Sequence, residues 1–311
     1  MQVFHKLEDL PRDYERTVVS VGNFDGVHRA HTGLLEGIVR RAEESKAKAV
    51  AVCFEPHPTR ILRPEKELKL ITPQAKKLSL LEETGVDAVL LLPFTRDLSS
   101  MRPRAFAESI LQNGLHACAV HEGYNFRFGH RAEGDAAMLA HLGREMNFRV
   151  EVHPEMVLRG QTVSSTQVRH LISDGKVSRA RYLLGRPFSV TSTPNPGRGL
   201  GSKYTVPTIN LGDYKELVPA NGVYITRTRV GEDCFDSVTN VGNRPTLAEH
   251  SFAIETHLLK FHPIELSPET EVEIYFFQRL RDEIKFPSVE ALREQINKDV
   301  ARAQRFFRLV E

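Results

Sequence analysis

The sequence has little cysteine, almost no net charge and no long apolar run. Its three cysteines, Cys53, Cys118 and Cys234, cannot all pair and lack metal-type spacing, which favours a reduced intracellular compartment. Lys and Arg number 42 against 40 Asp and Glu, and a net charge of +2 excludes attraction of nucleic acid or membranes by the whole surface. No stretch resembles a signal peptide or could span a bilayer. We therefore expect a cytoplasmic protein that binds neither nucleic acid nor membranes.

The proportions of hydrophobic and charged residues are typical of a folded globular protein. Hydrophobic residues make up 41% and charged residues 26% of the chain, and the mean hydropathy is −0.32. At about 150 residues per domain, 311 residues predict about two domains, each large enough to bury a core.

The first half alternates short apolar runs with amphipathic runs, which is the pattern of a parallel α/β sheet. Strands are expected at residues 17–21, 49–54, 87–92, 117–120 and 148–152, with helices between them. One helix is expected after Thr72 as N-cap and Pro73 in the first turn. Two further helical runs, near 166–173 and 177–184, complete this domain.

The second half is richer in Pro and Gly and has short β-rich runs, which predict an antiparallel barrel or sandwich. These runs cover residues 222–229, 235–241, 252–259 and 271–277. A final helix is expected over 288–305, with Ser288 as its cap and an apolar stripe of Leu292, Ile296, Val300 and Ala303. The predicted domains are therefore 1–185 and 186–311.

A glycine-rich segment follows the first predicted strand and leads into a helix. It reads Gly22, Asn23, Phe24, Asp25 and Gly26, and His28 and His31 come next. Glycines let the backbone approach a phosphate, and a helix N-terminus and two imidazoles can donate hydrogen bonds to one anion. The structural alternative is a simple turn in which His28 caps the helix and His31 lies at the surface.

A second segment with anion-binding chemistry opens a later helix. Ser164, Ser165 and Thr166 supply three hydroxyls, and Arg169 adds a positive charge. Ordinary N-capping is the alternative, but it requires only one of these hydroxyls.

Several motifs, taken in order, make the chain resemble the family of bifunctional bacterial enzymes that join riboflavin kinase to FAD synthetase. In the first half these motifs are residues 22–31, 54–58, 125–129 and 164–169, and residues 184–188 mark the join. In the second half they are residues 207–210, 221–224, 240–246 and 254–257. The resemblance covers nearly the whole chain.

The resemblance implies a Rossmann-like nucleotidyltransferase domain followed by a Greek-key barrel with a C-terminal helix. The barrel would phosphorylate riboflavin to FMN with ATP and Mg²⁺, and the first domain would adenylylate FMN with a second ATP to give FAD and pyrophosphate. The expected partners are therefore small molecules: ATP, riboflavin and FMN. Because Trp is absent, the flavin ring must stack on Phe, Tyr or aliphatic side chains.

For the adenylyltransferase, the resemblance implies roles for residues already singled out. His28, His31, Ser164, Ser165, Thr166 and Arg169 would stabilise negative charge at the phosphates, while Gly22 to Gly26 would shape the ATP pocket. Asn125 would lie near the α-phosphate and the flavin phosphate. Pro56 and Pro58 would line the flavin side, or else form a rigid turn.

For the kinase, the resemblance implies a metal site, a base and a phosphate loop. Thr208 and Asn210 would offer oxygen ligands to Mg²⁺, and Glu255 would act as base toward the ribityl hydroxyl. The phosphate loop would comprise Gly197, Arg198, Gly199 and Gly201.

Two departures from the family pattern leave alternatives open. Ala30 stands where glycine is usual, and residues 202–206 interrupt the run that leads to Pro207. One alternative is an FMN adenylyltransferase with an impaired kinase domain, and another is a flavin-binding regulatory module without turnover. A transferase acting on another phosphorylated acceptor is less favoured because the second domain also matches. Any homo-oligomer is expected to be weak.

Overall fold

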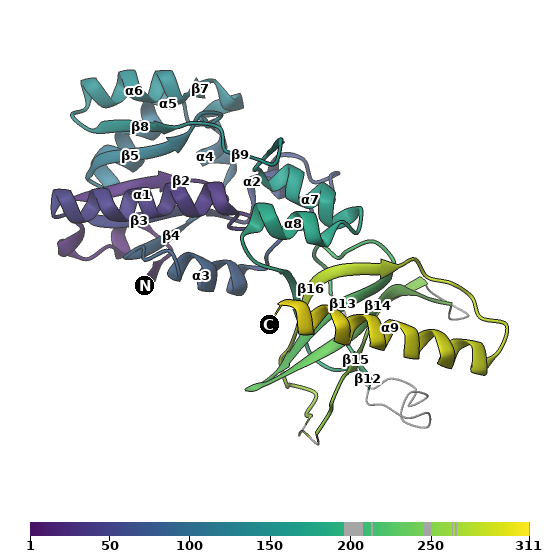
Figure 1. Cartoon of the computed structure of the whole chain (residues 1–311). Coiled ribbons are helices and arrows are strands. Elements are labelled where there is room, and N and C mark those ends of the chain that lie inside the picture. The colour runs from purple at the N-terminus through teal and green to yellow at the C-terminus, as the bar shows by residue number, and fades with distance from the viewer. Residues whose placement is uncertain (196–207, 213, 246–249, 263, 265, 311) are drawn as a thin grey trace. The chain divides into compact units, whose positions relative to one another are not determined.

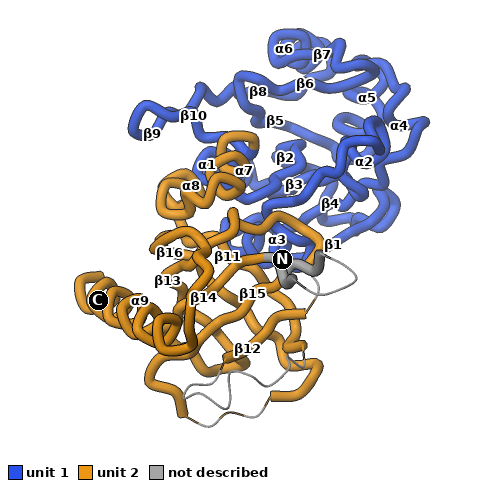
Figure 2. Tube along the Cα trace, turned by 90° about the vertical axis from the view of Figure 1, so that its right-hand side faces the viewer, with its two compact units in different colours: residues 1–165 blue, residues 166–311 orange. Residues whose placement is uncertain are grey.

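The chain forms two compact units, residues 1–165 and 166–311 (Figure 2). The structure is a computed structural model that describes all residues except 196–207, 213, 246–249, 263, 265 and 311, and for 243–245 and 250–252 it describes the backbone alone. Helix α8 (Val177–Leu184) packs on two strands of the second unit and therefore belongs to that unit. The second unit, as defined by residue contacts, begins at residue 166. A domain boundary at 185/186 stays a prediction.

The first unit is built on a parallel sheet with the strand order β1-β4-β3-β2-β5-β8. Figure 1 labels β4, β3, β2, β5 and β8. The predicted α/β class is confirmed, and the ends of the five predicted strands agree with the structure to within three residues. Only the edge strand β1, three residues long, was not predicted. The strands are β1 (Gln2–Phe4), β2 (Thr17–Val21), β3 (Lys48–Glu55), β4 (Ala88–Pro93), β5 (Ala117–Gly123) and β8 (Arg149–His153).

Helices cover both faces of this sheet because its strands are apolar on both sides. Residues on one face, such as Val18 and Val89, pack under Leu35 and Leu81. The longer helices of the unit are α1 (Arg29–Ser45), α3 (Gln74–Glu82), the π-helix Ala107–Gly114, which continues the short helix α5 (Pro103–Phe106), and α6 (Ala136–Glu145). Short elements are α2 (Pro58–Leu62), α4 (Arg96–Ser100), the 3₁₀ turns Leu7–Asp9, Arg12–Tyr14 and His130–Ala132, and strands β6 (Arg127–Phe128), β7 (Gly134–Asp135), β9 (Val157–Leu158) and β10 (Gln161–Thr162).

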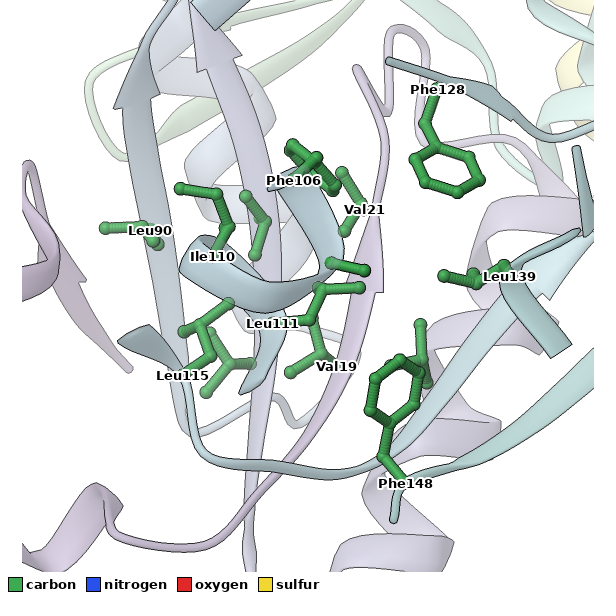
Figure 3. Packing of buried hydrophobic residues seen from close by; sticks show 14 of the residues in the cluster. Val19, Val21, Leu90, Phe106, Ile110, Leu111, Leu115, Phe128, Leu139 and Phe148 are labelled. Carbon is green, nitrogen blue, oxygen red and sulfur yellow. The ribbon is translucent and has the colours of Figure 1, made fainter. Parts of the chain in front are cut away.

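The opposite face of the sheet carries the core shown in Figure 3. Val19 and Val21 of β2 and Leu90 of β4 alternate with the residues that face α1 and α3, and they pack against Phe106 and Leu111. Because buried side chains alternate between the two faces, one sheet supports a layer of helices on each side. The loops at the carboxyl ends of the strands are then the place where a ligand can bind.

The second unit is a curled antiparallel sheet with the strand order β11-β16-β13-β14-β15-β12. Its ends meet, because Gly212 N donates to Thr193 O at 2.7 Å and Asn195 N to Asn210 O at 2.8 Å. The predicted antiparallel barrel is therefore confirmed. Its strands are β11 (Phe188–Ser192), β12 (Thr208–Asn210), β13 (Gly222–Val230), β14 (Asp233–Pro245), β15 (His250–Leu258) and β16 (Val272–Arg281), and it also contains α8 and most of α7 (Ser165–Ser173).

Helix α9 (Val289–Val310) packs on the outer face of this sheet. The Ser288 hydroxyl accepts a hydrogen bond from Ala291 N at 3.2 Å, so the predicted cap is confirmed. The predicted apolar stripe is only half correct: Ala303 is buried, but Leu292 and Ile296 are each 39% exposed. Phe307, outside the predicted helix, is buried instead, because the C-terminal half of α9 contacts the sheet. Within the described residues, no helix is long and apolar enough to cross a membrane.

Candidate active sites

The glycine-rich segment lies where the connections of the parallel sheet change direction. The chain leaves β2 toward β3 on one side, and β5 pairs with β2 on the other. In open α/β sheets, ligands bind in the crevice at such a switch point, beyond the carboxyl ends of the strands. Gly22 follows β2 directly, and Asn125 lies in the turn that follows β5.

Asp25 holds the loop after β2 in place. Its buried carboxylate accepts hydrogen bonds from Ile71 N at 2.9 Å and Thr72 N at 3.1 Å, and Gly26 N donates to the Thr72 hydroxyl at 2.7 Å. These contacts tie the loop to a segment 46 residues downstream. The sequence predicted Asp25 in a nucleotide pocket; the structure shows that its carboxylate fixes the loop after β2, and its place in such a pocket stays a prediction.

The same loop contains strained backbone. Gly26 has φ +88°, which suits glycine, but Phe24 and Val27 have φ of 46° and 36°. For a β-branched residue such as Val27 this conformation costs about 1–3 kcal/mol. Strain of this kind persists only where surrounding contacts over-determine the loop, and it concentrates at ligand-binding sites.

His28 and His31 lie together at the start of α1. His28 caps the helix, as the structural alternative predicted: its Nδ1 accepts from His31 N at 3.3 Å. The two rings stack with centroids 3.6 Å apart. Because Nδ1 accepts a backbone hydrogen bond, the ring proton of His28 is on Nε2, which can donate to an anion. Capping and anion binding are therefore compatible at this residue.

The hydroxyl-rich segment reaches the same loop through Ser165, the first residue of α7. The Ser165 hydroxyl donates to the Asp25 carbonyl at 2.8 Å, across 140 residues of sequence. Ser164 precedes it and is partly buried, while Thr166 and Arg169 follow on α7 and belong to the second unit. Within the first unit, the structure thus brings Ser165 of the predicted hydroxyl segment to the loop that carries the histidines.

Two asparagines offer polar atoms in this region. Asn125 is exposed in the turn closed by the hydrogen bond from Phe126 N to Gly123 O at 3.0 Å. The side-chain oxygen of Asn23 is buried and has no hydrogen-bond partner among the residues that the structure describes. A buried polar atom without a partner is costly, which favours a ligand group at this position.

Glu122, at the end of β5, is a residue that the sequence analysis missed. It is 2% exposed, and its carboxyl accepts a hydrogen bond from Val21 N at 2.7 Å. The β2–β5 ladder stops at Val19 and Val120, so this side chain replaces the next backbone acceptor. Burial raises the pKa of Glu122 well above its ordinary value. The available signal was an acidic residue in an apolar strand directly before a glycine.

Replacing Glu122 by glutamine should stabilise the protein more at high pH than at low pH. The folded parent keeps a proton on Glu122 above pH 4.5, where the unfolded chain releases it, so folding of the parent weakens as pH rises. Gln retains an acceptor for Val21 N and does not titrate. The difference in unfolding free energy should grow by at most about 1.4 kcal/mol per pH unit. Thermal unfolding of both proteins from pH 5 to 8 measures it, and a constant difference would contradict the prediction.

Pro56 and Pro58 lie after β3. Pro56 follows a cis peptide bond, and Pro58 is the first residue of the short helix α2. His57 caps that helix through Nδ1, which accepts from Thr59 N at 3.2 Å. The rigid-turn alternative thus describes the local backbone, and contact with a flavin stays a prediction.

The predicted kinase residues meet on one face of the curled sheet. Strand β12 pairs with β15 so that Asn210 lies opposite Glu255 and Thr208 opposite His257. On the other side of β15, Asn240 of β14 also lies opposite Glu255. Directly opposed side chains point to the same side, with Cβ atoms about 4.5–5.5 Å apart. We call Thr208, Asn210, Asn240, Glu255 and His257 the polar face.

The polar face adjoins the apolar surface under α9. Val238, opposite His257, packs with Ala303 and Phe307 of that helix. Burial lowers the pKa of His257, so its ring is neutral at neutral pH. The intervening residues Ile209 and Thr256 point to the other side and are buried. The sequence analysis included Asn240 and His257 in the family motifs but gave them no role, although the alternation along β15 puts His257 on the same face as Glu255.

The predicted phosphate loop cannot be placed. Gly197, Arg198, Gly199 and Gly201 lie outside the described residues, as do residues 202–206. Ala30 is described: it is helical in the first turn of α1, where its methyl group causes no backbone strain.

Comparisons with known proteins point to two enzyme families. The family model for FAD synthetase matches residues 10–167, and the model for riboflavin kinase matches residues 184–307. A bifunctional riboflavin kinase/FMN adenylyltransferase of Pseudomonas fluorescens is 35% identical over 98% of this chain and 97% of its own. The corresponding protein of Escherichia coli K12 is 32% identical, over 99% and 97%. A solved structure described as a macrolide-efflux protein from Streptococcus pneumoniae matches with TM-score 0.88 and 25% identity, over 97% of this chain and 98% of its own.

Proposed function

The chain belongs to the bifunctional riboflavin kinase/FMN adenylyltransferase family, and we propose that its two reactions divide between the loop after β2 and the polar face. It phosphorylates riboflavin to FMN with ATP, and it adenylylates FMN with ATP to form FAD and pyrophosphate. The observation that carries this conclusion is that both domains are present in one chain, matched over nearly its full length.

In the adenylyltransferase, an FMN phosphate oxygen attacks the α-phosphorus of ATP, and the bond to the bridging oxygen of the pyrophosphate breaks. The FMN phosphate is already an anion, so no general base is needed. We propose that Nε2–H of His28 donates to a phosphate oxygen and that His31 and the backbone after Gly22 stabilise the added charge.

The remaining predicted residues complete this site. Ser164, Ser165, Thr166 and Arg169 would bind the phosphates, and the Ser165–Asp25 contact at 2.8 Å supports this role for Ser165. Asn125 would contact the phosphates being joined, and Pro56 and Pro58 would border the flavin. Asp25 and Glu122 would not touch the substrates. Asp25 positions the loop after β2, and Glu122 positions the end of β2.

In the kinase, the ribityl hydroxyl must lose a proton as its oxygen attacks the γ-phosphorus of ATP. We propose Glu255 as the base that accepts this proton. Thr208 and Asn210 would hold Mg²⁺, since neutral oxygen donors beside a carboxylate suit a hard cation. When bound, Mg²⁺ neutralises charge on the ATP phosphates. The residues Gly197, Arg198, Gly199 and Gly201 would form the phosphate loop.

Product analysis with riboflavin and FMN as parallel substrates tests this function. With ATP and Mg²⁺, riboflavin should give FMN and then FAD, and FMN should give FAD with pyrophosphate. FAD from FMN without FMN from riboflavin would instead identify an adenylyltransferase with an impaired kinase. Tight flavin binding without release of ADP or pyrophosphate would identify a regulatory module.

A further inference from the structure

Three side chains of the types that bind metals form a cluster, and none of them has been assigned a role in either reaction. His121 is on β5, and Glu151 and His153 are on β8, the edge strand of the parallel sheet. The β5–β8 register places His121 opposite Glu151 and Gly123 opposite His153, so all three side chains point to the same face. We call them the edge cluster.

The distances within the edge cluster are short. His121 Nδ1 lies 3.2 Å from His153 Nε2, and His121 Nε2 lies 3.6 Å from a carboxylate oxygen of Glu151. One ligand atom from each residue lies within 4.8 Å of the other two. The His121 side chain is 4% exposed and that of Glu151 53%, so the cluster is buried at one end and open to solvent at the other.

We propose that the edge cluster binds a divalent ion of the Zn²⁺ type through His121, Glu151 and His153, with water as a fourth ligand. At Zn–N bonds of about 2.0–2.1 Å, two tetrahedral nitrogen ligands lie about 3.3 Å apart. The observed separation of 3.2 Å therefore requires little movement. Two imidazoles and one carboxylate suit Zn²⁺, Co²⁺ or Ni²⁺, whereas Mg²⁺ prefers oxygen ligands alone.

The helix above the cluster leaves room for both imidazoles. Gly37 of α1 faces them, and a Cβ at this position would lie 3.1 Å from His153 Cε1 and 3.4 Å from His121 Nδ1. The exposed carboxylate of Glu151 gives an ion a path from solvent.

A bound ion would connect the edge cluster to the turn after β5 that carries Asn125. His153 pairs with Gly123, and Tyr124 N donates to His153 O at 2.9 Å. The next residue is Asn125, which we propose contacts the phosphates. The ion would thus fix the β8 end of the turn that carries Asn125.

Cobalt titration of the full chain without a histidine tag or nucleotide provides the test. Tetrahedral Co²⁺ absorbs visible light much more strongly than octahedral Co²⁺. The parent should bind one equivalent with the intense spectrum, which Zn²⁺ should remove and excess Mg²⁺ should not. A weak octahedral spectrum, or removal by Mg²⁺, would overturn the proposal.

Variants then assign the spectrum to the edge cluster. His121→Asn and His153→Gln should each abolish the intense absorption. Glu151→Gln should lower Co²⁺ affinity by more than about 10–100-fold, the loss that removal of an outer-shell partner alone causes. The matched control is His141→Ala, which removes an exposed histidine 3.0 Å from Glu145 and should bind like the parent. If His121→Asn does not fold, His153→Gln carries the test. An unchanged spectrum in His153→Gln would overturn the proposal.

Thermal unfolding gives a second readout. Because an ion that binds only the folded state stabilises it, Zn²⁺ should raise the Tm of the parent and of His141→Ala. It should leave the Tm of His153→Gln unchanged. An equal shift in all three proteins would place the Zn²⁺ elsewhere and overturn the proposal.

Discussion

Replacing His28 by alanine should lower the rate of FMN adenylylation by about 10²–10³-fold and leave riboflavin phosphorylation near that of the parent. Loss of one preorganised donor to developing charge typically costs this much. The expected cause is the missing Nε2–H donor, whose position is set by the Nδ1 contact to His31 N at 3.3 Å. Steady-state rates with FMN and with riboflavin as substrates measure both activities.

His28 also caps α1, so a second variant must separate the two roles. Asparagine is among the best N-cap residues, and His28→Asn should keep the Tm of the parent. His28→Ala should be less stable by about 1 kcal/mol. Both variants should lose adenylylation if the imidazole donates to phosphate. Full activity in His28→Asn would reduce His28 to a helix cap, and equal loss of both reactions would contradict the assignment to one site.

Replacing Glu255 by glutamine should lower FMN formation from riboflavin by about 10²–10⁴-fold, the usual effect of removing a general base. Gln keeps the size and hydrogen-bonding capacity of the side chain opposite Asn210 and Asn240 but cannot accept the ribityl proton. Conversion of FMN to FAD should stay near the parent rate. Separate assays of the two steps make the comparison.

The matched control is Glu271→Gln. The Glu271 side chain is 69% exposed, next to Arg229 and away from the polar face, so this variant should keep both activities. Unchanged phosphorylation in Glu255→Gln would exclude Glu255 as the base. Equal loss of both reactions would point to a general defect of folding.

Local patterns in the sequence predicted those features that depend on neighbouring residues. Five strands of the parallel sheet follow from apolar runs bounded by turn residues, and the cap at Ser288 follows from its hydroxyl before an amphipathic run. The loop after β2 follows from its glycines and histidines at a strand–helix junction. Each of these signals involves only a few neighbouring residues, so the sequence alone is enough to recognise it.

Features that depend on remote contacts were missed or incompletely predicted. The pKa of Glu122 is raised because apolar strands from other parts of the chain bury it, although the hydrogen bond from Val21 N opposes that rise. Asp25 fits a phosphate loop by sequence, yet its carboxylate bonds to Ile71 and Thr72. The stripe on α9 was predicted from its period, but which half of the helix is covered depends on where the sheet lies.

By itself, the sequence determined the two-domain order, the α/β and antiparallel classes and the residue types available for phosphate chemistry. The tertiary structure decided which of those residues meet. Asn210 and Glu255 are neighbours because β12 and β15 pair in one register, and a shift by one residue would turn every side chain of β12 to the other face. Register depends on hydrogen bonds between distant segments and on burial of the alternate side chains, and neither can be read from a local run of residues.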